Sequence, residues 1–119
     1  MGQPGVYVAL SEFCKHEDTA RRVLTEAGFG VREMPMGRRL KREEMFEALH
    51  EADAVLAGLE PYDGELLKAL PRLRCISRCG VGTDNIDLET ASRRNIAILT
   101  TIDEVVEPVA QMTVGMILA

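Results

Sequence analysis

The sequence predicts an α/β fold of three layers, a five-stranded parallel sheet with helices on both faces. Short runs rich in valine, isoleucine and leucine alternate five times with segments of helical periodicity, a pattern typical of βα units on a parallel sheet. The length of 119 residues suits one domain. With 46% hydrophobic and 28% charged residues, the chain is neither disordered, collagen-like nor a coiled coil.

The first two βα units occupy the N-terminal part of the chain. Residues 6–10 and 31–34 are predicted as strands, the second weaker than the first. A helix is expected from about residue 18, ending at Gly28, because four apolar residues repeat at helical spacing: Ala20, Val23, Leu24 and Ala27. A second helix over residues 43–51 carries an apolar face formed by Met45, Phe46 and Leu49.

The remaining strands are predicted at residues 54–57, 73–77 and 96–99. A short helix over residues 64–70 presents three leucines inward and ends before Pro71. A further helix over residues 88–94 begins after Asp87, whose carboxylate can accept hydrogen bonds from the first backbone amides.

The last predicted helix begins near Asp103 and carries no charge from Pro108 onward. Its apolar residues lie around most of the helix rather than along one stripe, so it needs cover on more than one side. Such an uncovered surface indicates an interface or a truncation. We expect truncation, with the natural chain continuing past Ala119.

Charge and cysteine content exclude several classes of partner. The formal net charge of −5 argues against a nucleic-acid-binding module. Three cysteines without paired spacing, Cys14, Cys75 and Cys79, indicate reduced thiols. The N-terminus lacks a secretory pattern, and the longest uncharged stretch, residues 108–119, is shorter than the ~18 apolar residues of a membrane span. We therefore expect a cytoplasmic protein with neither a nucleic-acid nor a membrane partner.

No metal site is predicted. Cys14 and His16 offer two ligands after the first strand, with Asp18 nearby, but no second pair completes a site. The alternative for His16 is an approach to the functional cleft, because loops that follow parallel strands share one edge of the sheet.

Residues 78–87 form the one segment that predicts chemistry. They follow the fourth strand and lead into a helix, at the edge where open α/β sheets bind ligands. Gly80 and Gly82 flank Val81 and let consecutive N–H groups turn toward one point, a concavity suited to a carboxylate. The dinucleotide fingerprint GxGxxG fails, because Asn85 stands at its third glycine.

Two alternatives remain open for this segment. It can be a plain strand-to-helix turn in which Asp84 and Asp87 bind local amides. Arg78 can pair with an anionic substrate or form a surface ion pair.

The motif GVGTDNID at residues 80–87, with residues 57–61, 66–71, 96–101 and 109–119, resembles the NAD-dependent D-isomer-specific 2-hydroxyacid dehydrogenases, the relatives of phosphoglycerate dehydrogenase. The resemblance covers about residues 53–119. It implies a flavodoxin-like (Rossmann-like) substrate, or catalytic, domain over residues 1–102. Residues 103–119 would then begin an interdomain helix that leads to an NAD-binding domain farther along the chain.

The resemblance also implies roles for individual residues. The amides of Val81 and Gly82 would grip the substrate carboxylate, with Gly80 setting the turn and Arg78 beside them. Val81 and Val109 would line the cofactor side, where NAD is expected and NADP is the alternative. The family's catalytic Arg, Glu and His lie farther along, so no catalytic residue falls within this chain.

From the resemblance we expect the parent protein to transfer a hydride between NAD(H) and a D-2-hydroxy acid or its 2-oxo acid, as a homodimer. The 119 residues alone are expected to be inactive. Ala57 and Gly58 stand where phosphoglycerate dehydrogenases place an arginine, which argues against a phosphorylated substrate. Ile102, Val105 and Gln111 depart from the family pattern, and they leave open a non-catalytic dehydrogenase-like module for ligand sensing or interaction.

Overall fold

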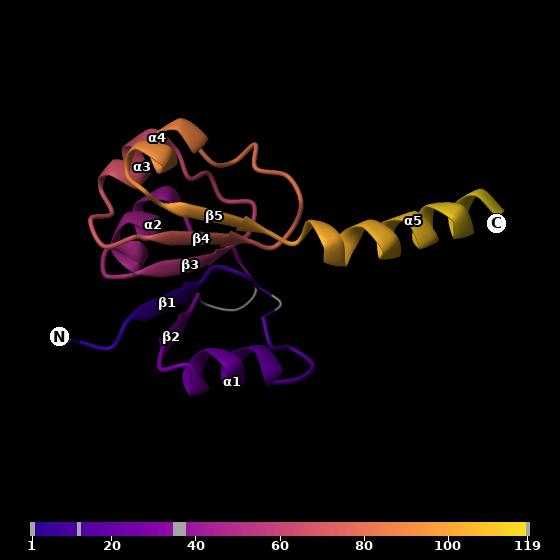
Figure 1. The fold of residues 1–119 in the computed structure, drawn as a ribbon, viewed down its shortest axis with the longest axis horizontal. Coiled ribbons are helices and arrows are strands. Elements are labelled where there is room, and N and C mark those ends of the chain that lie inside the picture. Colours follow the sequence, from indigo (N-terminus) through magenta and orange to yellow (C-terminus); the bar gives the residue numbers. More distant parts are fainter. Residues whose placement is uncertain (1, 12, 35–37, 119) are drawn as a thin grey trace.

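The computed structural model describes residues 2–11, 13–34 and 38–118, with the backbone alone described at residues 102–107 and 109. Five parallel strands form one sheet in the order β2-β1-β3-β4-β5 (Figure 1). Strands and helices alternate along the chain as follows: β1 (Gly5–Val8), α1 (Thr19–Glu26), β2 (Gly30–Glu33), α2 (Arg42–Leu49), β3 (Ala54–Ala57), α3 (Gly64–Lys68), β4 (Cys75–Arg78), α4 (Leu88–Arg93), β5 (Ala97–Thr100) and α5 (Ile102–Leu118). The predicted α/β class and the flavodoxin-like topology are both confirmed.

The strand order determines which helices share a face of the sheet. The chain moves one way along the sheet from β1 to β2, and the opposite way through β3, β4 and β5. Because βαβ crossovers are right-handed, α1 is placed on one face and the helices α2, α3 and α4 on the other. Figure 1 shows these three helices grouped together and α1 standing apart from them.

The main core lies between the sheet and α2, α3 and α4. Three leucines of the α3 segment, Leu66, Leu67 and Leu70, are fully buried there against Val55 and Ile76. The predicted inward face of α3 is therefore confirmed. Burial of each such side chain stabilises the fold by about 1.5–3 kcal/mol.

The face on the α1 side is largely open. The apolar stripe predicted for α1 buries no residue fully, and Val23 is 59% exposed. Beside α1 a cavity of about 480 Å³ lies over the sheet, lined by side chains that include Leu24, Phe29, Leu56 and Cys75. Helical periodicity predicted the helix correctly, but the periodicity does not determine how much of the sheet one helix can cover.

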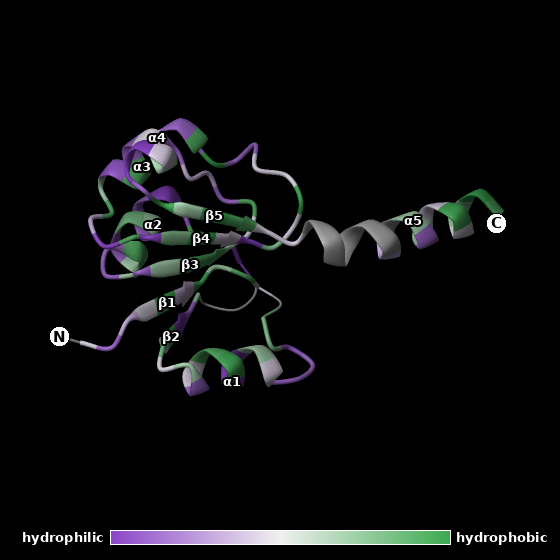
Figure 2. Cartoon of the chain, viewed as in Figure 1, coloured by the Kyte–Doolittle hydropathy of each residue, from purple (hydrophilic) through white to green (hydrophobic). Residues whose placement is uncertain are grey.

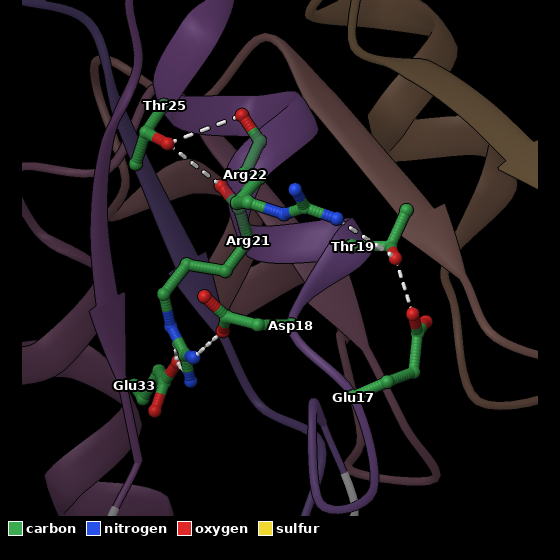
Figure 3. A network of polar contacts seen from close by, with 7 residues as sticks. All are labelled: Glu17, Asp18, Thr19, Arg21, Arg22, Thr25 and Glu33. Carbon is green, nitrogen blue, oxygen red and sulfur yellow. Dashed lines mark hydrogen bonds and ion pairs between the residues drawn. The ribbon is translucent and has the colours of Figure 1, made fainter.

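Helix α1 is joined to the sheet by a surface network of charges (Figure 3). The Arg21 guanidinium binds the carboxylate of Asp18 at the helix start, and its Nε donates to Glu33 Oε1 of β2 at 2.8 Å. Asp18, one of the three residues weighed as metal ligands, therefore pairs with an arginine. No group of three metal-ligating side chains occurs in the described part of the chain.

Side-chain caps fix the starts of two short helices on the other face. The predicted cap of α4 is confirmed, since the Thr90 amide and hydroxyl donate to the two carboxylate oxygens of Asp87 at 3.1 and 2.9 Å. Asp63 caps α3 in the same way, accepting from the Leu66 amide at 2.9 Å.

Helix α5 begins after a single connecting residue and extends away from the body (Figure 1). Hydrophobic residues alternate with polar ones along its second half and make up its last turn (Figure 2), and Met112, Met116, Ile117 and Leu118 are between 67% and 81% exposed. The segment without charges from Pro108 onward thus forms an uncovered apolar surface, as the sequence predicted. No helix among the described residues is long and apolar enough to cross a membrane.

Candidate carboxylate-binding site

The loop after β4 is anchored at both sides of its glycine turn. The Cys79 amide donates to the Ala57 carbonyl of β3 at 3.0 Å. The Gly80 amide donates to Thr101 Oγ1 at 2.9 Å, and the Thr101 amide donates back to the Gly80 carbonyl at 3.0 Å. Gly80 has φ +143°, a backbone conformation that side chains rarely adopt. The turn therefore requires glycine and is held in one position.

Val81 and Gly82 follow this turn at the carboxyl edge of the sheet, and both are exposed. Within the described residues, neither backbone amide donates a hydrogen bond to the protein. A side chain added at Gly82 would meet no atom within 4 Å, so the space beside it is open. Two neighbouring amides that are available as donors beside open space suit a carboxylate.

Arg78 lies beneath the loop. Its residue is only 8% exposed, and its Nη1 donates to the Cys79 carbonyl. The guanidinium occupies the space that a Gly80 side chain would take, with Cζ at 3.0 Å from that Cβ position. Its Nε has no hydrogen-bond partner among the residues that the structure describes. The structure thus places a buried positive charge under the glycine turn, rather than a surface ion pair.

The segment after β3 lies against the other end of the loop. The Asn85 side-chain amide donates to the Gly58 and Glu60 carbonyls at 3.0 and 2.8 Å. The Tyr62 amide donates to the Asn85 carbonyl at 2.7 Å, and the Asp87 amide donates to the Tyr62 carbonyl at 2.9 Å. The loop is therefore bound at its far end to residues 58–62.

Two buried polar residues support this second anchor. Glu60 is 5% exposed, and its Oε2 accepts from the Gly58 amide at 3.0 Å and from the Tyr62 hydroxyl at 3.2 Å. Burial, and then the negative charge of Glu60, raise the pKa of Tyr62 well above its ordinary value. The phenol therefore stays protonated and donates.

Sequence reasoning named neither Glu60 nor Tyr62 as a site residue, and it treated Asn85 only as a misfit to the dinucleotide fingerprint. The signal available was a glutamate two residues after the glycine that ends an apolar strand segment. That pattern alone does not show which loop the glutamate supports.

A cavity of about 160 Å³ opens at the same edge of the sheet, next to Gly58. Its lining includes Ala9, Leu10 and Ser11 after β1, Arg39, and Gly58 with Glu60 after β3. The polar part of this lining consists of the Ser11 residue, the positively charged Arg39 and the negatively charged Glu60. Met34 and Leu59 also line it, so the cavity has both polar and apolar walls.

The other sequence candidates lie outside this arrangement. His16 is exposed in the loop between β1 and α1, and it does not line the cavity. Asp84 is exposed in the loop. The side chain of Val109, expected on the cofactor side, lies outside the described residues.

Comparison with known proteins places the chain among dehydrogenases. Residues 8–115 match the model of the D-isomer specific 2-hydroxyacid dehydrogenase catalytic domain. The chain is 36% identical over 92 residues to a glyoxylate reductase of Thermococcus gammatolerans, covering 76% of this chain and 28% of that protein. It is 33% identical over 105 residues to a D-3-phosphoglycerate dehydrogenase of Methanocaldococcus jannaschii, covering 87% of this chain and 19% of that protein.

Solved structures agree with this assignment. The NAD+-bound 3-phosphoglycerate dehydrogenase of Entamoeba histolytica superposes with a TM-score of 0.72 at 27% identity, over 84% of this chain and 33% of that one. The PH0520 protein of Pyrococcus horikoshii gives a TM-score of 0.75 at 28% identity, over 96% and 32%. The chain thus spans a third or less of these relatives. It belongs to the family of D-isomer specific 2-hydroxyacid dehydrogenases, within the catalytic domain.

Proposed function

We propose that this chain is the substrate-domain portion of an NAD-dependent oxidoreductase. The enzyme transfers a hydride between NAD(H) and a D-2-hydroxy acid or the corresponding 2-oxo acid. Residues 1–102 form the substrate domain, and residues 103–119 begin the helix that leads to the NAD-binding domain. The parent enzyme is a homodimer.

The observation that carries this proposal is that the amides of Val81 and Gly82, both exposed residues, donate to no other described residue, in a member of this family. Charge-assisted hydrogen bonds from two amides hold a carboxylate in one orientation. The buried charge of Arg78 beneath the turn adds a positive potential at the same place. Because both ends of the loop are anchored, the amides are oriented before the substrate binds, which lowers the entropic cost of binding.

The residues of this chain fit only the edge of an NAD site. Asn85 uses its side chain to bind the Gly58 and Glu60 carbonyls, and this loop does not hold a pyrophosphate. Val81 is 44% exposed and offers an apolar surface to the nicotinamide ring, with Val109 proposed beside it. When bound, NAD supplies or accepts the hydride. A proton donor is equally required, and we propose that it lies outside these 119 residues, which alone are inactive.

The substrate is a short, unphosphorylated 2-oxo acid or 2-hydroxy acid. The names of the relatives include glyoxylate reductase and D-3-phosphoglycerate dehydrogenase. Two small residues, Ala57 at the end of β3 and Gly58 directly after it, lie where the sequence resemblance places an arginine for a substrate phosphate. This difference favours the glyoxylate-like substrates.

A titration monitored by amide NMR tests the binding half of the proposal. The chain is titrated with oxamate, an unreactive analogue of a 2-oxo acid, and with oxamide as the matched uncharged control. Saturable binding of oxamate and its absence for oxamide is the expected result. Equal responses to both compounds, or no response to oxamate, would refute carboxylate binding.

A second assay tests the reaction half. The chain is mixed with NADH and glyoxylate, and the expected result is no oxidation of NADH. Turnover by these 119 residues would overturn the assignment of the chemistry to residues elsewhere.

A further inference from the structure

We propose that Glu60 is the positioning residue of the carboxylate-binding loop. It fixes the residue 58–62 segment, and this segment holds Asn85 and thereby the orientation of the Val81 and Gly82 amides. The inference rests on the proposed function, because it concerns the same loop.

Glu60 is an unusual core residue. Its exposed fraction is 5%, and no arginine or lysine forms an ion pair with it among the residues that the structure describes. Removing a carboxylate from water is costly unless hydrogen bonds compensate it. The compensation comes from the Gly58 amide and the Tyr62 hydroxyl. Both donors belong to the segment that anchors the loop.

The turn held by Glu60 also aligns two backbone carbonyls. Glu60 bends the chain back so that its own carboxylate meets the Gly58 amide, two residues earlier. This bend presents the Gly58 and Glu60 carbonyls together to one donor, the side-chain amide of Asn85, at 3.0 and 2.8 Å. Loss of the carboxylate releases the bend, and Asn85 then loses its fixed pair of acceptors.

The position of Asn85 in the chain explains why loss of its two acceptors would affect the Val81 and Gly82 amides. Asn85 lies three residues after Gly82, whereas Gly80 on the other side is already held by Thr101. The segment between these two anchors contains both free amides. With one anchor released, the amides lose their common orientation while the rest of the sheet keeps its contacts.

Tyr62 connects the same carboxylate to the charge beneath the loop. The negative charge of Glu60 raises the pKa of the Tyr62 phenol and the positive charge of Arg78 lowers it. The phenol thus experiences both buried charges.

The test compares oxamate affinity in three variants. Glu60→Ala removes the acceptor, Glu60→Gln keeps an acceptor oxygen, and Glu26→Ala changes an exposed glutamate on α1 as the matched control. Because hydrogen bonds to charged groups contribute strongly, E60A should weaken oxamate binding about tenfold. E60Q should restore affinity to within about threefold of the original chain, and E26A should leave it unchanged.

Tyr62→Phe provides a milder variant if E60A does not fold. It removes one donor to Glu60 and should weaken binding about threefold. Hydrogen exchange is measured in parallel. The Tyr62 and Asp87 amides should exchange at least about tenfold faster in E60A, while amides of β1 keep their protection.

The outcomes separate this inference from the proposed function. If the original chain binds oxamate and the folded E60A or Y62F binds it equally well, the role of Glu60 is refuted and the proposed function stands. If E60Q binds as weakly as E60A, the hydrogen-bond account is refuted. If the original chain does not bind oxamate, both proposals fail.

Discussion

Replacing Gly80 by alanine should destabilise the fold through two separate effects. At φ +143° a residue with a Cβ atom is strained by about 1–3 kcal/mol. The new methyl group would also overlap the guanidinium of Arg78, which is buried and donates to the Cys79 carbonyl. Displacing that guanidinium loses a charged hydrogen bond, about 1.5–3 kcal/mol. The expected loss of unfolding free energy, if the two effects add, is therefore about 2.5–6 kcal/mol.

Urea denaturation followed by circular dichroism measures this loss. Gly82→Ala is the matched control, because a Cβ atom there meets nothing within 4 Å, and its change should stay within about 0.5 kcal/mol. In a chain that already carries R78A, adding G80A should cost only the backbone strain of about 1–3 kcal/mol, because no guanidinium remains for the methyl group to overlap. A G80A variant as stable as the original chain, or a G82A variant as damaged as G80A, would refute the reasoning.

Three further predictions follow from other contacts. Asp87→Ala should lower the unfolding free energy by about 1 kcal/mol in urea denaturation, because Asp87 caps α4, with Asp84→Ala neutral as its control. A hydrogen bond from Arg38 lowers the pKa of Glu44 to about 2, below its ordinary 4.5. The ionised Glu44 carboxylate therefore stabilises the fold above pH 4.5, and this stabilisation is lost as the pH falls toward 2. Glu44→Gln should remove this pH dependence from the unfolding free energy measured between pH 4.5 and 2. Exposed apolar side chains on α5 predict concentration-dependent self-association in light scattering; Met116→Lys with Ile117→Lys should abolish it, whereas an original chain that is monomeric at all concentrations would contradict it.

The sequence predicted those elements whose signals are local. The strand at residues 54–57 is a continuous apolar run, and its predicted and observed bounds agree. The cap at Asp87 was predictable because a carboxylate before a helix needs only the next three residues. The open face beside α1 was not predictable from helical spacing, since the exposure of Val23 depends on what else covers the sheet.

In the candidate site, too, local sequence signals located some residues, whereas others depend on contacts between distant segments. Gly80, Val81 and Gly82 could be located from their glycine spacing and from their place after a strand, although their role as a binding site is still a proposal. The contribution of Glu60, Tyr62 and Asn85 depends on contacts between loops 25 and 27 residues apart. No local pattern contains such contacts, because the sheet order brings the ends of β3 and β4 together.

A crystal structure of the chain with oxamate tests the central claim, that the loop after β4 binds a carboxylate through its main chain. We expect a carboxylate oxygen about 2.7–3.1 Å from the backbone nitrogens of Val81 and Gly82, with the Gly80 turn unchanged. Oxamate bound through Arg39 in the neighbouring cavity, with both loop amides exposed to water, would contradict it.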